Sequence, residues 1–300
     1  MAVPKRKRRQ RLPLHFGFAT MQATPARRPL PSPPFVSISM SSTATPLPPW
    51  PYPRWIAHRG AGKLAPENTL AAFRLGAQHG YRMFECDAKL SADGVPFLMH
   101  DATLHRTTNG VQVLGAAASP TGGDHPWSML SQLDAGGWHS RSHAGEPLPT
   151  LENLARYCIA NGLFLNIEIK PTPGAEETTG RVVGETTTRL WQGQATPPLL
   201  SSFQPEALKG AMSAAPHIPR ALLLDTLRDG WADMARQLGC VAIVCNHALW
   251  DAALVAQVQG LGMRTLSYTV NDDWAAQRLI ALGTDGIITD RVDFFPPATA

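Results

Sequence analysis

The chain has 300 residues, 44% of them hydrophobic, which is enough for one (β/α) barrel of about 250 residues or for two smaller domains. The formal charge of +4 is unevenly spread, because residues 1–54 hold nine basic and no acidic side chains, whereas residues 55–300 hold 18 basic and 23 acidic ones. The excess of basic residues lies in the N-terminal segment, so the net positive charge gives no reason to expect that the folded body binds nucleic acid.

Apolar runs and cysteines narrow the class of protein further. No run approaches the about 18 apolar residues that a membrane helix needs, so we expect no membrane span. The four cysteines lack CxxC spacing, and three of them lie in or beside apolar runs. This pattern predicts buried, reduced thiols and favours a cytoplasmic protein.

The N-terminal segment, residues 1–54, contains 12 of the 27 prolines and almost no periodic pattern. We therefore expect a basic, proline-rich, disordered tail. The basic run Lys5–Arg9 also allows a secretory signal or a tail for an anionic surface, although Pro13 interrupts the apolar stretch that a signal needs. Because Met40 is another possible start, we favour the interpretation that residues 1–39 are inert or a start-site artefact.

The body of the chain alternates short β-rich runs with helical patterns. The first run, Trp55–His58, precedes a helix that Asn68 or Thr69 caps. The next two runs, Met83–Asp87 and Pro96–His100, are separated by only eight residues. A crossover helix cannot fit there, so we expect a hairpin-like excursion rather than a parallel pair.

Residues 101–149 are loop-rich and predict an insertion rather than a barrel unit. A helix then extends from its cap at Thr150 through Asn161. Strand-like runs follow, most of them separated by helical patterns, at Phe164–Ile169, Pro198–Ser202, Ala221–Leu224, Val241–Cys245, Arg264–Thr269 and Gly286–Thr289. Without the excursion, eight strands alternate with helices, which predicts a closed TIM-type (β/α)8 barrel.

Polar side chains end these runs, at the positions where the loops of such a barrel build an active site. They are His58-Arg59, Glu85 with Asp87, His100-Asp101, Glu168 with Lys170, Ser201-Ser202-Phe203, Tyr268 with Asn271, and Asp290. The two members of the pairs Glu85/Asp87 and Glu168/Lys170 are two residues apart and share one face of a strand.

Each of these features alone has a structural explanation, such as a hydrogen-bonded histidine or an ion pair. Three carboxylates among apolar strand residues, however, cannot all stay ionised without a cationic partner. Glu85, Asp87 and Glu168 match the oxygen ligands of Ca²⁺ or Mg²⁺. Arg59 and Lys170 would supply positive charge for a phosphate. Two histidines beside such a centre can act as base and acid, which favours phosphodiester cleavage.

The same motifs stand in one order and spacing over residues 55–295. They are Ala57-His58-Arg59-Gly60, Pro66-Glu67-Asn68-Thr69, Glu85-Cys86-Asp87, Asp93-Gly94-Val95, His100-Asp101, Arg106-Thr107-Thr108, Glu168-Ile169-Lys170, Leu200-Ser201-Ser202-Phe203, Tyr268-Thr269-Val270-Asn271 and the final Asp285–Asp290. In combination they resemble the signature of the glycerophosphodiester phosphodiesterase family, and most of all its bacterial cytoplasmic branch.

This resemblance implies an irregular TIM-type (β/α)8 barrel over residues 55–295, with a small insertion at about residues 101–149. It implies a phosphoric diester hydrolase of glycerol and lipid metabolism. The expected reaction converts small-molecule glycerophosphodiesters, such as glycerophosphocholine or glycerophosphoethanolamine, to sn-glycerol 3-phosphate and an alcohol. The resemblance also implies one divalent cation, Ca²⁺ or Mg²⁺.

Carried over motif by motif, the resemblance gives roles to nine residues. They are the catalytic base His58 and acid His100, the metal ligands Glu85, Asp87 and Glu168, the phosphate-binding Arg59 and Lys170, and the substrate-pocket residues Phe203 and Tyr268. Related sequences often carry Trp where this chain has Tyr268, which puts the shape of the alcohol-side pocket in doubt but not the chemistry.

Two other functions are compatible with the same pattern. A phospholipase or sphingomyelinase D-like barrel would act on intact lipid and would need an exposed apolar rim, for which the insertion offers little beyond Trp127 and Trp138. A catalytically inactive barrel would only bind, but the complete set of histidines and carboxylates argues against it. Hydrolysis assays with added divalent metal separate the three.

Overall fold

Parallel strands close into a barrel in the computed structural model, which describes residues 47 and 49–297. The eight barrel strands of this part of the chain are β1 (Trp55–Ala57), β2 (Met83–Leu90), β4 (Phe164–Ile169), β5 (Leu199–Ser202), β6 (Arg220–Leu224), β7 (Cys240–Asn246), β8 (Arg264–Tyr268) and β9 (Gly286–Thr289). Strand β1 pairs in parallel with both β2 and β9, and these pairings close the sheet. The predicted (β/α)8 barrel is confirmed.

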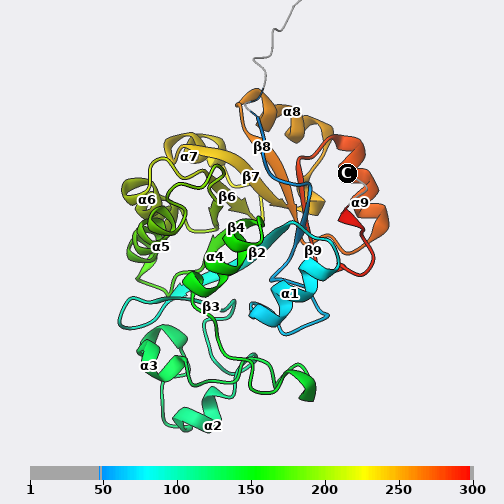
Figure 1. Ribbon diagram of the computed structural model, residues 1–300. Coiled ribbons are helices and arrows are strands. Elements are labelled where there is room, and N and C mark those ends of the chain that lie inside the picture. Colours follow the sequence, from blue (N-terminus) through cyan, green and yellow to red (C-terminus); the bar gives the residue numbers. More distant parts are fainter. Residues whose placement is uncertain (1–46, 48, 298–300) are drawn as a thin grey trace, which may run out of the picture. The chain divides into compact units, whose positions relative to one another are not determined.

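Helices connect the barrel strands and surround them (Figure 1). They are α1 (Leu70–Gln78), α4 (Leu151–Ala160), α5 (Glu176–Leu190), α6 (Pro205–Ala214), α7 (Trp231–Gln237), α8 (Ala252–Gly260) and α9 (Asp273–Leu282). The short 3₁₀ turn η3 (His247–Leu249) follows β7. Thr69 caps α1 and Thr150 caps α4, because each side-chain oxygen accepts a backbone N–H of the first turn.

The predicted excursion is strand β3 (Pro96–Leu98), which pairs antiparallel with the far end of β2. The insertion that follows contains η1 (Gly122–Asp124), η2 (Arg141–His143), α2 (Gly110–Leu114) and α3 (Trp127–Leu130). Figure 1 shows α2 and α3 on the β3 side of the barrel. The insertion has a small core of its own, made by Phe97, Met99, Leu104, Leu130, Leu133, Ala135 and Leu148.

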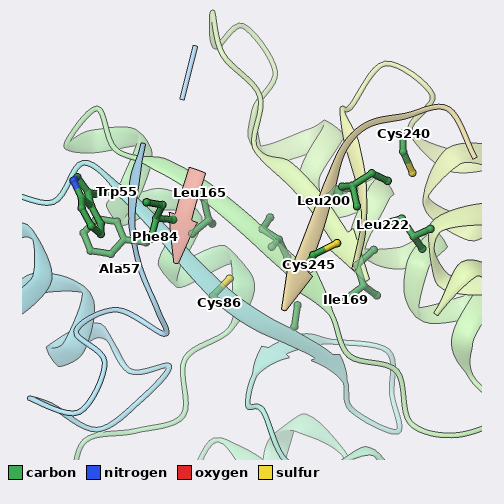
Figure 2. Packing of buried hydrophobic residues seen from close by; sticks show 14 of the residues in the cluster. Trp55, Ala57, Phe84, Cys86, Leu165, Ile169, Leu200, Leu222, Cys240 and Cys245 are labelled. Carbon is green, nitrogen blue, oxygen red and sulfur yellow. The ribbon is translucent and has the colours of Figure 1, made fainter. Parts of the chain in front are cut away.

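Two apolar clusters line the two faces of the barrel wall. Successive residues of β1 divide between them, because Ile56 belongs to the inner cluster, while Trp55 and Ala57 belong to the outer one. Figure 2 shows the outer cluster, in which the labelled side chains come from strands spread around the barrel. The four cysteines are buried and free, as predicted.

The chain packs against the barrel before β1 begins. Tyr52 is buried, and its hydroxyl donates a hydrogen bond to the Pro197 carbonyl oxygen (2.8 Å). Its ring meets that of Phe164 edge-on, which covers the end of the barrel opposite the carboxyl ends of the strands. Most of the segment expected to be a tail, residues 1–46, lies outside the described residues. Among the described helices, none has the length and apolar character that crossing a membrane requires.

Candidate active site

A cavity of about 340 Å³ opens at the carboxyl ends of the barrel strands. Eight of the nine residues singled out in the sequence line it: His58, Arg59, Glu85, His100, Glu168, Lys170, Phe203 and Tyr268. The ninth, Asp87, is fully buried beside them, with its carboxylate 3.2 Å from Arg59 Nε. Barrel closure therefore brings together residues from β1, β2, β3, β4, β5 and β8 or the loops after them.

Strand register places the three acidic side chains side by side. Asp87 of β2 is paired with Glu168 of β4, and Glu85 precedes Asp87 on the same inward face. One carboxylate oxygen from each residue lies within 4.8 Å of the corresponding oxygens of the other two. This separation suits a single ion held by all three carboxylates.

Burial makes it costly to ionise all three carboxylates at once. Burial, together with the Asp87 carboxylate, raises the pKa of Glu168 to about 7. Burial and the two neighbouring carboxylates also raise the pKa of Glu85 well above its ordinary value. Burial acts in the same direction on Asp87, but Arg59 and Lys170 outweigh it and lower the pKa of this carboxyl. The cluster thus needs more positive charge than these two side chains provide.

Arg59 and Lys170 contact the acidic cluster from two sides. The backbone N–H of Arg59 donates to Glu85 Oε2 (3.1 Å), and Arg59 Nη1 donates to Glu67 Oε1 (2.9 Å). Lys170 Nζ lies 2.9 Å from Glu168 Oε1 and 5.5 Å from the centre of the Phe203 ring. Both cations therefore stand at the wall of the cavity, where they can meet an anionic group.

Asp290 and Asn271 hold the His58 ring. His58 Nδ1 lies 2.7 Å from Asp290 Oδ1, while Asn271 Nδ2 donates to the other oxygen of the same carboxylate (2.9 Å). The Asp290 carboxylate favours a hydrogen on Nδ1, which leaves Nε2 free on the cavity side, 3.8 Å from Glu85 Oε2. This arrangement suits a proton acceptor at Nε2.

Asp101 holds His100 in the same manner. His100 Nδ1 lies 2.9 Å from Asp101 Oδ1, and Arg106 donates to both oxygens of that carboxylate. Burial lowers the pKa of His100, although the Asp87 and Asp101 carboxylates oppose this effect. The second histidine thus also presents Nε2 away from its carboxylate partner.

Phe203 and Tyr268 form an aromatic wall of the cavity. Their rings meet edge-on with centroids 5.5 Å apart. The Tyr268 hydroxyl donates to the Leu224 carbonyl oxygen (3.1 Å), which fixes the ring. An apolar wall of this kind can pack against the carbon atoms of a polar substrate.

The sequence offered Asn68 only as a possible helix cap, whereas the structure places it against a predicted metal ligand. Asn68 is buried at φ +59°, Thr69 takes the cap, and the Asn68 side chain bonds Asp87 instead. The sequence places Asp290 and Asn271 at strand ends but does not predict that Asp290 contacts both His58 and Asn271. The motif Pro66-Glu67-Asn68-Thr69 was the available signal for Asn68, but its contact lies 19 residues away along the chain.

Comparison with known proteins places this chain in a family. The model of the glycerophosphoryl diester phosphodiesterase family matches residues 58–294. A glycerophosphodiester phosphodiesterase of Caldanaerobacter subterraneus subsp. tengcongensis is 31% identical over 243 residues, which are 78% of this chain and 93% of that protein.

Solved structures agree with the sequence comparison. A phosphodiesterase of Oleispira antarctica, solved in complex with the product sn-glycerol 3-phosphate, superposes with a TM-score of 0.72 at 32% identity, covering 82% of this chain and 94% of that one. A glycerophosphodiester phosphodiesterase of Agrobacterium tumefaciens gives a TM-score of 0.66 at 28% identity, covering 83% and 100%. Since the family model spans most of the chain and all three relatives are covered almost completely, this protein belongs to the glycerophosphoryl diester phosphodiesterase family of enzymes.

Proposed function

We propose that this protein hydrolyses water-soluble glycerophosphodiesters, such as glycerophosphocholine and glycerophosphoethanolamine, to sn-glycerol 3-phosphate and an alcohol. One observation carries the proposal: a single cavity is lined by two carboxylate-held histidines, a buried acidic cluster and two cations. This set provides what phosphodiester hydrolysis needs, namely a base, an acid and positive charge around the phosphate. The Oleispira antarctica relative was solved with sn-glycerol 3-phosphate, which is the product that we propose for this protein.

The acidic cluster fits one divalent cation, Ca²⁺ or Mg²⁺. Glu85 Oε1 and Asp87 Oδ1 are buried and accept no hydrogen bond from the described residues, so each has a free oxygen for an ion. Carboxylate oxygens are the ligands that these cations prefer, and Glu168 would complete the set. When bound, such a cation would stabilise negative charge on the phosphate oxygens.

The two histidines divide the proton transfers. His58 Nε2, with Nδ1 held by Asp290, would take a proton from the attacking water. His100, held by Asp101, would give a proton to the departing alkoxide. The anionic phosphodiester favours the protonated ring of His100 and so offsets the effect of burial on the pKa of this histidine.

The remaining cavity residues bind and orient the substrate. Arg59 and Lys170 would attract the phosphate oxygens, and their contacts with the acidic cluster fix them in place. Phe203 and Tyr268 would pack against the carbon atoms of the diester.

The test is a hydrolysis assay of the full chain with added Mg²⁺ or Ca²⁺. Glycerophosphocholine, glycerophosphoethanolamine and vesicles of intact phosphatidylcholine are supplied in separate reactions, and sn-glycerol 3-phosphate and choline are measured. We expect sn-glycerol 3-phosphate from the soluble diesters and no choline from the vesicles. Choline release from vesicles alone would support the intact-lipid alternative, and no turnover of any diester would contradict the proposal.

A further inference from the structure

Arg106 of the insertion joins two carboxylates that belong to different parts of the site. Its Nε and Nη2 donate to the two oxygens of Asp101 (2.7 and 2.8 Å). Its Nη1 and Nη2 donate to the two oxygens of Glu67 (2.7 and 2.8 Å). One guanidinium therefore makes a bidentate contact with each carboxylate, and bidentate pairs are stronger and more specific in geometry than single hydrogen bonds.

The two carboxylates connect Arg106 to different residues of the site. Asp101 accepts from His100 Nδ1, so its orientation determines where the other ring nitrogen points. Glu67 lies in the loop between β1 and α1, and Arg59 Nη1 ties it to the barrel (2.9 Å). Glu67 keeps this second partner when Arg106 is removed, whereas Asp101 loses its link to the barrel.

We propose that Arg106 is a positioning residue for His100: by bridging Asp101 to Glu67, it locks the His100–Asp101 pair onto the barrel. The inference rests on the proposed function, in which His100 protonates the leaving alcohol. Arg106 itself does not line the catalytic cavity and stands behind Asp101. It acts on the reaction through the geometry of another side chain.

The shape of the guanidinium is essential to this role. Lysine would keep the charge but cannot make bidentate hydrogen bonds to two carboxylates at once. The centroid of the Trp138 ring, also from the insertion, lies 5.9 Å from the Arg106 guanidinium carbon, which is within the range of a cation–π contact. The strong Asp101 contact also shows in the lowered pKa of that carboxyl, for which the hydrogen bonds from Arg106 are the main cause.

The experiment compares Arg106→Lys and Arg106→Gln on two substrates, glycerophosphocholine and a glycerol p-nitrophenyl phosphodiester. The nitrophenolate leaves without a proton, so its release does not need His100. We expect kcat for glycerophosphocholine to fall about 10- to 100-fold, as for a misplaced catalytic group, while kcat for the activated ester changes less than about threefold. The KM of both substrates should stay within about threefold of the wild type, because Arg59 and Lys170 keep their partners.

Two further measurements separate positioning from a general structural effect. In a His100→Ala background, Arg106→Gln should cause no additional loss, because the residue through which it acts is gone. Guanidinium ion should restore part of the glycerophosphocholine turnover of Arg106→Ala. The matched control is Arg156→Gln on α4, which breaks the Nε and Nη2 hydrogen bonds to one oxygen of Glu152, outside the cavity, and should leave the turnover of both substrates unchanged.

Equal losses on both substrates, or an additive loss in the His100→Ala background, would overturn the proposal and make Arg106 a residue of general stability. Unchanged turnover of glycerophosphocholine by Arg106→Gln would also overturn it. If Arg106→Gln melts at a lower temperature than the wild type, the kcat values of Arg106→Lys and the guanidinium rescue of Arg106→Ala decide between positioning and general stability. Failure of the wild type to release sn-glycerol 3-phosphate would count against the proposed function itself.

Discussion

Asn68 and Asp87 exchange two hydrogen bonds. Asn68 Nδ2 donates to Asp87 Oδ2 (2.8 Å), and the Asp87 backbone N–H donates to Asn68 Oδ1 (3.1 Å). Asn68 adopts a φ of +59° to do so, and its own N–H donates to the Arg59 carbonyl oxygen (2.9 Å). Asparagine tolerates this left-handed conformation better than most residues, so one side chain meets both the backbone and the carboxylate requirement.

Replacement of Asn68 should weaken cation binding and, in one variant, also stability. Asn68→Gly and Asn68→Ala both remove the support of Asp87, and we expect Mg²⁺ or Ca²⁺ affinity to fall about 10- to 100-fold in each. Asn68→Ala should also unfold more easily than Asn68→Gly by about 1 kcal/mol, because alanine is strained at positive φ. Titration calorimetry and urea unfolding measure the two effects. Wild-type cation affinity in both variants would show that Asp87 does not depend on Asn68.

Chelation should abolish hydrolysis, and added Ca²⁺ or Mg²⁺ should restore it, because the acidic cluster would then regain its ion. Glu85→Gln removes one charge and should weaken cation affinity while the melting temperature stays close to that of the wild type. Glu152→Gln on the exposed face of α4 is the matched control and should bind the cation normally. Full activity in excess chelator, with metal content verified as nil, contradicts this prediction.

Cation affinity should increase with pH between about 6 and 8. The pKa of Glu168 is raised to about 7 and that of Glu85 is raised as well, so protons occupy these carboxylates at the lower pH. The cation requires the ionised forms, and its binding must displace those protons. Calorimetry in two buffers of different ionisation enthalpy measures proton release, which should be larger at pH 6 than at pH 8. A pH-independent affinity without proton release would rule out this account of the cluster.

The two histidines should each be required for turnover of glycerophosphocholine. His58→Ala or His100→Ala should lower kcat by at least about 10²-fold, the usual contribution of a positioned proton-transfer group. The double variant should lose less than the product of the two single losses, because groups that act as a unit are not additive. Near-normal turnover by either single variant would mean that this histidine is structural.

The choice of leaving group should separate the roles of the histidines. A p-nitrophenyl phosphodiester releases a phenolate that needs no proton, so it should rescue His100→Ala and leave His58→Ala impaired. Steady-state kcat for both substrates in both variants measures this. Rescue of His58→Ala instead would reverse the assignment of acid and base.

Local patterns in the sequence were enough to predict most of the architecture. Apolar runs of strand length alternate with capped helices, and the eight residues between Met83–Asp87 and Pro96–His100 exclude a crossover. The barrel, the hairpin and the buried cysteines followed from these features. Thr69 and Asn68 were equivalent as helix caps in the sequence, because both residue types favour that position. The difference between them arises from the contact of Asn68 with Asp87.

Long-range partners could not be predicted in this way. His58 and Asp290 are 232 positions apart, and they meet because β1 and β9 are neighbours in the closed barrel. Arg106 and Glu67 are 39 positions apart, and the fold of the insertion brings them together. No periodicity or capping rule encodes such distances.

The sequence by itself thus determined which polar residues meet at one end of the barrel, because strand-end positions in a (β/α) barrel converge whatever the details of packing. The tertiary structure alone decided how those residues are held: which carboxylate orients which histidine, and which carboxylate oxygens of the acidic cluster accept no hydrogen bond from the described residues. The physical reason is that composition and spacing act over a few residues, whereas hydrogen-bond partners depend on strand register and barrel closure across the whole chain.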